Sequence, residues 1–255
     1  MGCQILPMCH KTSFEIQEGA VFLADAHYNK ATGERSLERF FSHLQNLSQK
    51  PPQLFLLGDI FDMLFGGVAS TAKPNQEIID AIENLAKEVE VFYFEGNHDF
   101  RVEKFFSKNI TVFPFEKQPA LFTCKNKKAL LAHGDFDAPL GYRLYTKWIR
   151  NPLTLYVLNI YNSITDNSVL RYVQKHMDKK EQCREFEWFG EFVQKRVQKP
   201  TFECDIYIDG HFHQNKIFQL KNIKYINLGA FACNQRYFVV KFSNNEIVLE
   251  ENTLP

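Results

Sequence analysis

Short apolar runs, each ending in a polar cluster, recur along the chain. These runs cover residues 20–24, 53–57, 89–95, 128–132 and 205–209. Apolar runs of this length are typical of strands buried on both faces. Residues 36–47 and 75–89 have the spacing of amphipathic helices. This alternation predicts an α/β layered domain, with further strands at 225–228 and 237–242.

Polar residues follow five of the predicted strands. The clusters are Asp25-x-His27, Gly58-Asp59-x-x-Asp62, Gly96-Asn97-His98-Asp99, His133-Gly134-Asp135 and Gly210-His211-x-His213. Each cluster alone is ordinary, and a capped turn or a surface histidine would explain it. The carboxyl ends of strands in an open α/β sheet meet at one edge, where ligands bind. Five such clusters in order therefore predict one shared site.

The residue types in these clusters favour a metal site. Histidine nitrogens combined with carboxylate and amide oxygens suit Mn²⁺, Fe²⁺ or Zn²⁺, and the lack of a thiolate set argues against a structural zinc. The candidate ligands are Asp25, His27, Asp59, Asn97, His133, His211 and His213. Seven ligands imply two ions. Residues two apart on a strand point to opposite faces, so Asp25 and His27 can share an ion only if the chain turns after the strand.

The five motifs resemble those of the calcineurin-like metallophosphoesterase superfamily, D-x-H, G-D-x-x-D, G-N-H-[DE], H-G-[DH] and G-H-x-H, and all five match within residues 25–213. The resemblance implies a layered β-sandwich core flanked by helices (α/β/β/α). It also implies two divalent ions, with Mn²⁺ preferred and Fe²⁺, Zn²⁺ or Mg²⁺ as alternatives. By position, one ion would be held by Asp25, His27, Asp59 and His213, and the other by Asp59, Asn97, His133 and His211.

Two ions about 3.5 to 4 Å apart bind a phosphoryl oxygen and activate water, which predicts a phosphoester hydrolase. His98 follows a ligand without being one, and we expect it to stabilise the phosphoryl transition state or to protonate the leaving oxygen. Asp99 is expected to hydrogen-bond a histidine and fix its tautomer. Asp62 and Asp135 fit metal-site residues and helix caps equally well.

Residues 139–200 break the alternation, because they are aromatic, basic and helical in pattern. We expect a helical cap inserted between core segments 1–138 and 201–255. Its cations Arg143, Lys147 and Arg150 have spacings of four and three, which predicts one helix face turned toward bound phosphates. A solvated helix face is the alternative for the cations, and packing between helices is the alternative for the apolar residues.

The cap resembles that of UDP-2,3-diacylglucosamine pyrophosphatases of lipid A synthesis, because Tyr142 and Asn151-Pro152 keep the family's spacing after the H-G-D motif. The chain departs from the best-known branch at His98, where that branch has arginine. The resemblance implies cleavage of UDP-2,3-diacylglucosamine to UMP and 2,3-diacylglucosamine 1-phosphate, with the acyl chains in the cap. It also implies peripheral binding to the inner face of the cytoplasmic membrane. The implied substrate-binding residues are Tyr142, Arg143, Lys147 and Arg150.

Composition narrows the remaining alternatives. Thirty acidic residues balance thirty basic ones, so no extended basic face for nucleic acid is expected. Six scattered cysteines without a CxxC pair or a secretory segment favour a reducing cytoplasm, and no apolar run is long enough to span a membrane. A phosphoesterase for a nucleotide, a phosphoprotein or a nucleic-acid end stays open. The intact ligand set disfavours a metal-free scaffold, and the oligomeric state is left open.

Overall fold

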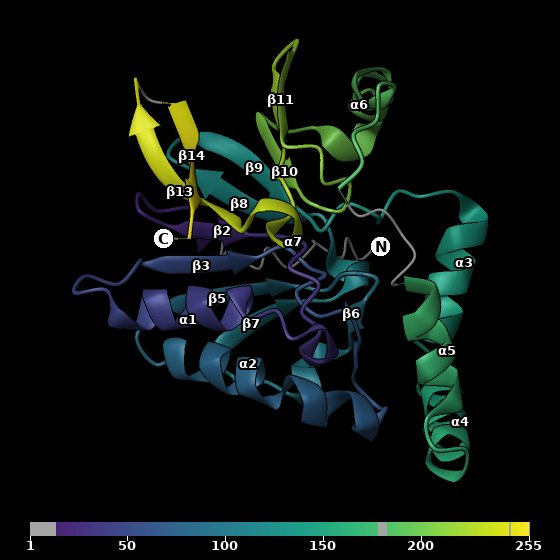
Figure 1. The fold of residues 1–255 in the computed structure, drawn as a ribbon. Helices are drawn as coiled ribbons and strands as arrows, with labels where there is room; N and C mark the ends of the chain where they lie inside the picture. The colour runs from purple at the N-terminus through teal and green to yellow at the C-terminus, as the bar shows by residue number, and fades with distance from the viewer. Residues whose placement is uncertain (1–13, 178–182, 245, 255) are drawn as a thin grey trace, which may run out of the picture.

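The computed structural model describes residues 14–177, 183–244 and 246–254 as two six-stranded sheets stacked face to face (Figure 1). The first sheet runs in the order β14 (Glu246–Thr253), β13 (Arg236–Ser243), β2 (Val21–Leu23), β3 (Gln53–Leu56), β5 (Glu90–Phe94) and β7 (Ile110–Phe113). The second runs in the order β1 (Phe14–Glu15), β8 (Ala120–Cys124), β9 (Lys127–Leu131), β10 (Ile206–Asp209), β12 (Ile223–Asn227) and β11 (Lys216–Leu220). A short pair joins β4 (Leu64–Phe65) and β6 (Asp99–Phe100).

Parallel pairing brings the carboxyl ends of the central strands together. Strands β2, β3, β5 and β7 are parallel neighbours, with Phe22 opposite Phe55 and Phe55 opposite Phe92. In the second sheet, β9, β10 and β12 are also parallel neighbours. Loops that leave these strands therefore converge at one edge of the stacked sheets, as the sequence predicts.

The alternation of side chains along each strand builds two separate cores. Phe22, Phe55 and Phe92 point between the sheets, where they pack with residues of the second sheet. Leu54 and Val91 point the other way, into the core beneath the helices. Both faces of β2, β3 and β5 are therefore buried, which explains why these central strands are mainly apolar.

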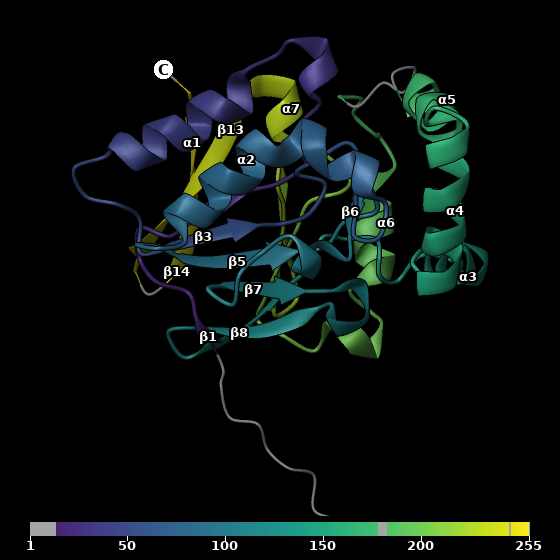
Figure 2. The ribbon, with the colours of Figure 1, turned by 90° about the horizontal axis from the view of Figure 1, so that it is seen from below.

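Helices α1 (Ser36–Asn46) and α2 (Ala72–Leu85) cover the outer face of the first sheet, as the view from below shows (Figure 2). Helix α6 (Phe189–Arg196) packs on the outer face of the second sheet, where Phe189 and Val193 contact Tyr207 and Tyr225. The α/β/β/α layering is thus confirmed. The remaining short elements are η1 (Lys30–Thr32), η2 (Ala69–Thr71), η3 (Val102–Lys104), η4 (Phe115–Lys117), η5 (Pro200–Phe202) and α7 (Phe231–Asn234).

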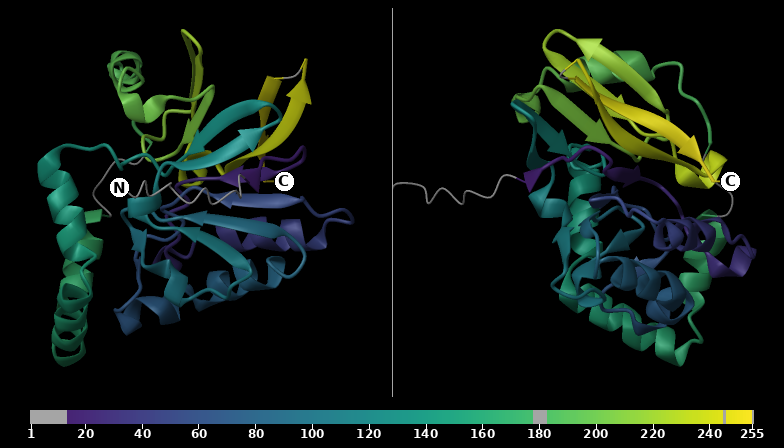
Figure 3. Two further views of the ribbon diagram at one scale, coloured as in Figure 1. Left: turned by 180° about the vertical axis from the view of Figure 1, so that it is seen from behind. Right: turned by 90° about the vertical axis from the view of Figure 1, so that its left-hand side faces the viewer.

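Helices α3 (Leu140–Ile149), α4 (Pro152–Ile164) and α5 (Ser168–Met177) form a column beside the sheets. The column is separate from the layers in Figure 1 and in the left panel of Figure 3. Helix α4 begins where the Asn151 side chain accepts a hydrogen bond from the amide of Leu153. Leu155 and Leu170 join the column to the core. The boundaries of the cap stay a prediction, and residues 178–182 within it lie outside the described residues. No helix in the described ranges has the length and apolar character needed to cross a membrane.

Cys183 and Cys233 form a disulfide that joins the segment before α6 to α7 across 50 residues. This pairing is not predicted from sequence, because the two cysteines come together only through long-range contacts of the fold, and it differs from the reduced thiols that a reducing cytoplasm would favour. Cys124 is buried and Cys204 is half-buried, and both are free thiols.

Candidate metal centre

Five of the predicted ligands lie on sharp turns directly after their strands. These residues have positive φ values, and they are Asp25 (53°), His27 (47°), Asp59 (50°), His211 (60°) and His213 (58°). Aspartate and histidine tolerate this left-handed conformation better than most residues. The turn after β2 therefore lets side chains two positions apart face the same site, as the sequence analysis requires for Asp25 and His27.

Two glycines let the ligand loops approach one another closely. A Cβ added at Gly96 would lie 2.1 Å from Oδ1 of Asp59, and one added at Gly210 would lie 2.4 Å from Oδ2 of Asp25. Neither contact can be relieved without moving a carboxylate of the site. These positions therefore need glycine for space, which is a stronger reason than flexibility alone.

The first group of potential ligands is Asp25, His27 and His213, whose ligand atoms all lie within 4.8 Å of one another. Nε2 of His213 lies 3.3 Å from Oδ1 of Asp25. Burial opposes ionisation of Asp25, but the neighbouring charge of His213 outweighs it and lowers the pKa of the carboxyl. An ionised carboxylate facing two imidazoles is a suitable donor set for a borderline divalent ion.

The second group is Asp59, His133 and His211, again with ligand atoms within 4.8 Å. Nε2 of His133 lies 3.4 Å from Oδ2 of Asp59, 3.1 Å from Nδ1 of His211 and 3.3 Å from Oδ1 of Asn97. Burial opposes ionisation of Asp59 too, and His133 again reverses the effect and holds the carboxyl pKa well below its usual range. The structure thus brings together all four residues that the sequence analysis assigns to one ion.

Hydrogen bonding determines which nitrogen of His133 faces the site. Nδ1 lies 2.9 Å from the carbonyl oxygen of Leu57, which can only accept, so Nδ1 donates. Burial opposes protonation of this ring, but the charge of Asp59 outweighs it and raises the pKa of His133 well above its usual value, so a bound ion would displace a proton from Nε2. Burial, reinforced by the neighbouring His133, lowers the pKa of His211 to about 4, so this ring is neutral and ready to coordinate.

A third group joins His27 to Asp62 and His98, with Oδ1 of Asp62 3.3 Å from Nδ1 of His27. Neither ring nitrogen of His27 has a hydrogen-bond partner among the described residues, and the same is true of Oδ1 of Asp62. Buried polar atoms without partners are costly, and a cation at this position would satisfy them. The site residues therefore fit divalent ions. Asp62 lies in the site and does not cap a helix.

His98 lies beside the ligands as the sequence predicts. Its amide donates to Oδ1 of Asp59 at 2.8 Å, and its Nδ1 lies 3.2 Å from the carbonyl oxygen of Asp62. That carbonyl requires Nδ1 to donate, which leaves Nε2 as the second functional nitrogen of the ring. Burial lowers the pKa of His98, so the ring is predominantly neutral near pH 7.

The structure corrects the expected role of Asp99, because its partners are backbone amides and a phenol, not a histidine. Its carboxylate accepts from the amides of Asp59, Ile60 and Gly96 at 2.6 to 3.0 Å, and from the hydroxyl of Tyr93 at 2.6 Å. It therefore fixes two ligand loops from beneath. Burial, together with the charge of Asp59, raises the pKa of Asp99 to about 7.

An apolar pocket of about 830 Å³ opens beside the metal centre. Asp62, Asn97 and His98 form its polar end. The remaining lining is mainly aromatic and aliphatic and comes from the column of helices, including Tyr142, Tyr145, Trp148, Leu153, Leu155, Val157, Leu158, Tyr161, Leu170 and Val173. The pocket thus connects polar residues of the metal centre to an elongated apolar surface.

The structure separates the predicted substrate-binding residues. Tyr142 lines the pocket, and its hydroxyl donates to Oδ2 of Asp135 at 3.0 Å, which places Asp135 at the site as well. Arg143 and Lys147 are exposed on α3. Arg150 is buried instead and donates to the carbonyl oxygen of Gly96 at 2.7 Å. The three cations therefore do not share an environment, since the C-cap Arg150 is buried against the loop of Gly96 while Arg143 and Lys147 face solvent.

Arg196 is a buried cation of this region that the sequence analysis misses. It contacts Asp209, just before His211, and the carbonyl oxygen of Gly134, just after His133. An arginine in a helix gives no sequence signal for contacts this far apart. The only hint is Asp209, a charged residue at the end of an apolar strand.

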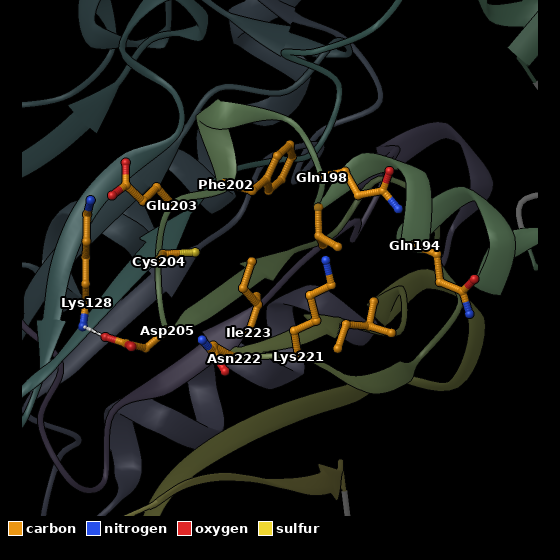
Figure 4. Close-up of a pocket in the computed structure, with 12 residues that line it drawn as sticks. Lys128, Gln194, Gln198, Phe202, Glu203, Cys204, Asp205, Lys221, Asn222 and Ile223 are labelled. Carbon is orange, nitrogen blue, oxygen red and sulfur yellow. Dashed lines mark hydrogen bonds between the residues drawn. The ribbon is translucent and has the colours of Figure 1, made fainter.

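A second hollow, of about 650 Å³, lies at the amino ends of β9, β10 and β12, away from the metal centre (Figure 4). Its walls mix aliphatic residues with amides, lysines and two carboxylates, and Asp205 accepts a hydrogen bond from the amide of Lys128 there. The candidate metal groups of the described chain all lie at the opposite ends of the strands.

Two buried carboxylate and histidine groups at the strand ends, beside a substrate-sized pocket, define a metal-dependent hydrolase. The model of the calcineurin-like phosphoesterase family matches residues 20–215, so the chain belongs to this family. A protein of Haemophilus influenzae (strain PittGG) named UDP-2,3-diacylglucosamine hydrolase is 27% identical over 222 residues, which cover 84% of this chain and 90% of that protein. A protein of the same name from Psychromonas ingrahamii is 29% identical over 145 residues, 55% of this chain and 58% of its own length.

Among solved structures, a dimetal phosphatase from Danio rerio is similar, with a TM-score of 0.48 and 13% sequence identity, over 92% of this chain and 95% of that one.

Proposed function

We propose that the protein hydrolyses the pyrophosphate of UDP-2,3-diacylglucosamine, releasing UMP and 2,3-diacylglucosamine 1-phosphate. One observation carries the proposal: the apolar pocket and the metal centre share the residues Asp62, Asn97 and His98. A substrate for this arrangement has a phosphorylated head and an apolar tail. The names of the relatives from Haemophilus and Psychromonas point to the same substrate.

In this proposal, Asp25, His27, Asp59 and His213 hold one divalent ion. Asp59, Asn97, His133 and His211 hold the other, and Mn²⁺ is the preferred metal. When bound, the two ions supply charge stabilisation for the attacked phosphoryl group and lower the pKa of a water nucleophile. The seven ligands, all with nitrogen or oxygen donors, match these ions in hardness.

His98 acts on the phosphoryl group in the proposed mechanism. Its Nδ1 is held by the carbonyl oxygen of Asp62, so the ring has a fixed orientation at the mouth of the pocket. Nε2 can then donate to a phosphoryl oxygen or to the leaving oxygen when the ring is protonated. Asp99 has no direct part in this step and acts by holding the loops of Asp59 and Gly96.

We further propose that residues 139–200 form a cap whose pocket binds the acyl chains. Burial of each methylene contributes about 0.8 kcal/mol, so a pocket of this lining can retain a lipid that a purely polar site would release. Tyr142, tied to Asp135, is placed to meet the sugar or phosphate between the two ends. Arg143 and Lys147 are exposed, and in this proposal they meet anionic lipid headgroups.

The outer surface of the same helices supports a peripheral position on the inner face of the cytoplasmic membrane. Large apolar side chains outside the pocket lining are exposed there, including Leu140 (69%), Leu144 (60%), Tyr156 (61%) and Ile164 (76%). Exposed apolar clusters of this size are typical of surfaces that meet a partner or a lipid. Placing the cap on the membrane would let the lipid enter the pocket without crossing water.

A test of the substrate is thin-layer separation of the products from UDP-2,3-diacylglucosamine in the presence of Mn²⁺. We expect UMP and the lipid monophosphate from the wild type and neither from Asp59→Ala. Turnover of bis-p-nitrophenyl phosphate without any lipid monophosphate would support a phosphoesterase for another substrate. Turnover of neither compound would refute the metal-centre assignment as well.

Trp148→Asp provides a test of the pocket, because Trp148 lines it and belongs to none of the candidate ligand groups. A charge at this position should raise KM for the lipid while leaving turnover of the small diester unchanged. Equal losses on both substrates by a variant that circular dichroism shows to be folded would contradict an acyl-binding role.

A further inference from the structure

Two arginines near the two ends of segment 139–200 are buried, Arg150 with 6% of its surface exposed and Arg196 with 1%. Each donates from Nη2 to a backbone carbonyl oxygen in a loop of the metal centre, Arg150 to Gly96 at 2.7 Å and Arg196 to Gly134 at 2.5 Å. Burying a guanidinium is costly unless it is well paired. The partners of these two arginines therefore indicate the role of segment 139–200.

Arg150 fixes the loop that carries Asn97. Its guanidinium lies 5.0 Å from the ring centre of Phe100 and 4.7 Å from that of Phe115, so two aromatic faces hold it in place. Gly96, the residue before Asn97, is held from both sides, because Arg150 donates to its carbonyl oxygen while Asp99 accepts from its amide.

Arg196 joins two further loops. Its Nη1 contacts Oδ2 of Asp209 at 2.7 Å and the hydroxyl of Tyr225 at 2.8 Å, while Nε and Nη2 contact Oδ1 of Asp137 at 3.0 and 2.7 Å. Asp209 in turn accepts from Asn227 at 2.7 Å. One guanidinium thus connects the loop after β9 to the last residue of β10.

The network continues to the peptides around His211. Nδ2 of Asn227 donates to the carbonyl oxygen of Gly210 at 2.5 Å, and Oδ1 of Asn227 accepts from the amide of Gln214 at 2.8 Å. The histidine loop 210–214 is therefore held at both ends by a residue that Arg196 reaches through Asp209. Aromatic rings at 5.2 to 5.6 Å surround the guanidinium and keep it in place.

We propose that Arg150 and Arg196 are positioning residues for one of the two ions, so that the helical segment builds part of the metal centre and does more than cover it. The held loops carry Asn97, His133 and His211, three of the four ligands proposed for the second ion. For the first ion, only His213 lies on a held loop, and in the described chain neither arginine contacts the loop of Asp25 and His27. The inference rests on the ligand assignment made under the proposed function.

The ion affected should be the second one. Residues that orient metal ligands typically contribute 10- to 100-fold to metal affinity. We therefore expect Arg150→Met and Arg196→Met to weaken one Mn²⁺ by about 10- to 100-fold and the other by less than about threefold. Arg196→Lys keeps the charge but cannot reproduce the forked contacts, so it should show the same selectivity with better folding.

The test is Mn²⁺ binding by equilibrium dialysis with spectroscopic counting of free ion, on the full chain. Lys195→Met is the matched control, because Lys195 is an exposed cation next to Arg196 on α6. It should bind both ions as the wild type does. Thermal unfolding of each variant in EDTA shows whether it is folded. If Arg196→Met is unfolded, the Mn²⁺ binding of Arg150→Met and Arg196→Lys tests the inference.

An activity measurement separates this role from direct substrate binding. If Arg150 acts through the ion, Arg150→Met should lose turnover of both the lipid and bis-p-nitrophenyl phosphate, and excess Mn²⁺ should restore turnover of the diester. Loss on the lipid alone, without rescue by Mn²⁺, would overturn the inference, as would equal weakening of both ions or of neither. A wild type that binds fewer than two ions would instead refute the ligand assignment itself.

Discussion

Replacing Asp99 with alanine should destabilise the protein by about 3 to 5 kcal/mol. The side chain is fully buried and accepts four short hydrogen bonds, from the amides of Asp59 (3.0 Å), Ile60 (2.6 Å) and Gly96 (2.8 Å) and from the hydroxyl of Tyr93 (2.6 Å). Alanine removes the acceptor of all four donors at once.

Each unsatisfied buried donor costs about 1 to 3 kcal/mol, but the four costs do not add. They surround one cavity, which a single water with about three hydrogen bonds can fill in part. For a chain of this size, with a urea dependence on the order of 3 kcal/mol per molar, the midpoint should fall by about 1 to 1.7 M. Asp99→Asn should lose roughly half as much, since one oxygen still accepts.

The measurement is urea unfolding followed by circular dichroism in EDTA, so that metal binding does not contribute. Asp80→Ala is the control, because Asp80 is an exposed carboxylate on α2 and should change stability by less than about 0.5 kcal/mol. If Asp99→Ala and Asp80→Ala unfold at the same urea concentration, the amide-holding role of Asp99 is wrong.

Three further results are expected. His98→Ala should lower kcat on bis-p-nitrophenyl phosphate by about 10²- to 10⁴-fold. Elemental analysis should find as much bound Mn²⁺ as in the wild type, and loss of Mn²⁺ would instead make His98 a ligand. Removal of metal with EDTA should lower Tm. Adding Mn²⁺ at about 100 times its Kd should raise the free energy of unfolding by about 2.7 kcal/mol. A Tm that EDTA does not change would contradict a metal centre. Cys183→Ser should lower the free energy of unfolding by about 4 kcal/mol in the absence of reductant, because it opens a loop of 50 residues. If the wild type gives identical urea unfolding curves with and without reductant, the disulfide is contradicted.

The strands that lead to the candidate ligands could be predicted from sequence because their signal is local. The run at residues 53–57 appears as β3 (Gln53–Leu56), and the helix expected at 36–47 appears as α1 (Ser36–Asn46). An apolar run followed by a glycine and a polar residue contains both the strand and the turn that ends it. The convergence of the ligands then follows from parallel pairing.

The contacts that hold the ligands could not be predicted, because they join distant segments. Arg196 meets Gly134 across 62 residues, and Arg150 meets Gly96 across 54. Spacing along a helix predicts which side chains share a face, but not which arginine is beyond the last turn and buried. The same limit applies to the pairing of Cys183 with Cys233, which depends on where α7 lies in the fold.

The left-handed backbone at Asp25, His27, Asp59, His211 and His213 has a consequence for how this chain could change. Non-glycine residues held in that region cost on the order of 1 kcal/mol each, and the site also crowds like charges. Glycine at any one of these positions would relieve the backbone while abolishing a ligand. The proposed chemistry and resistance to unfolding therefore make opposite demands on these five residues.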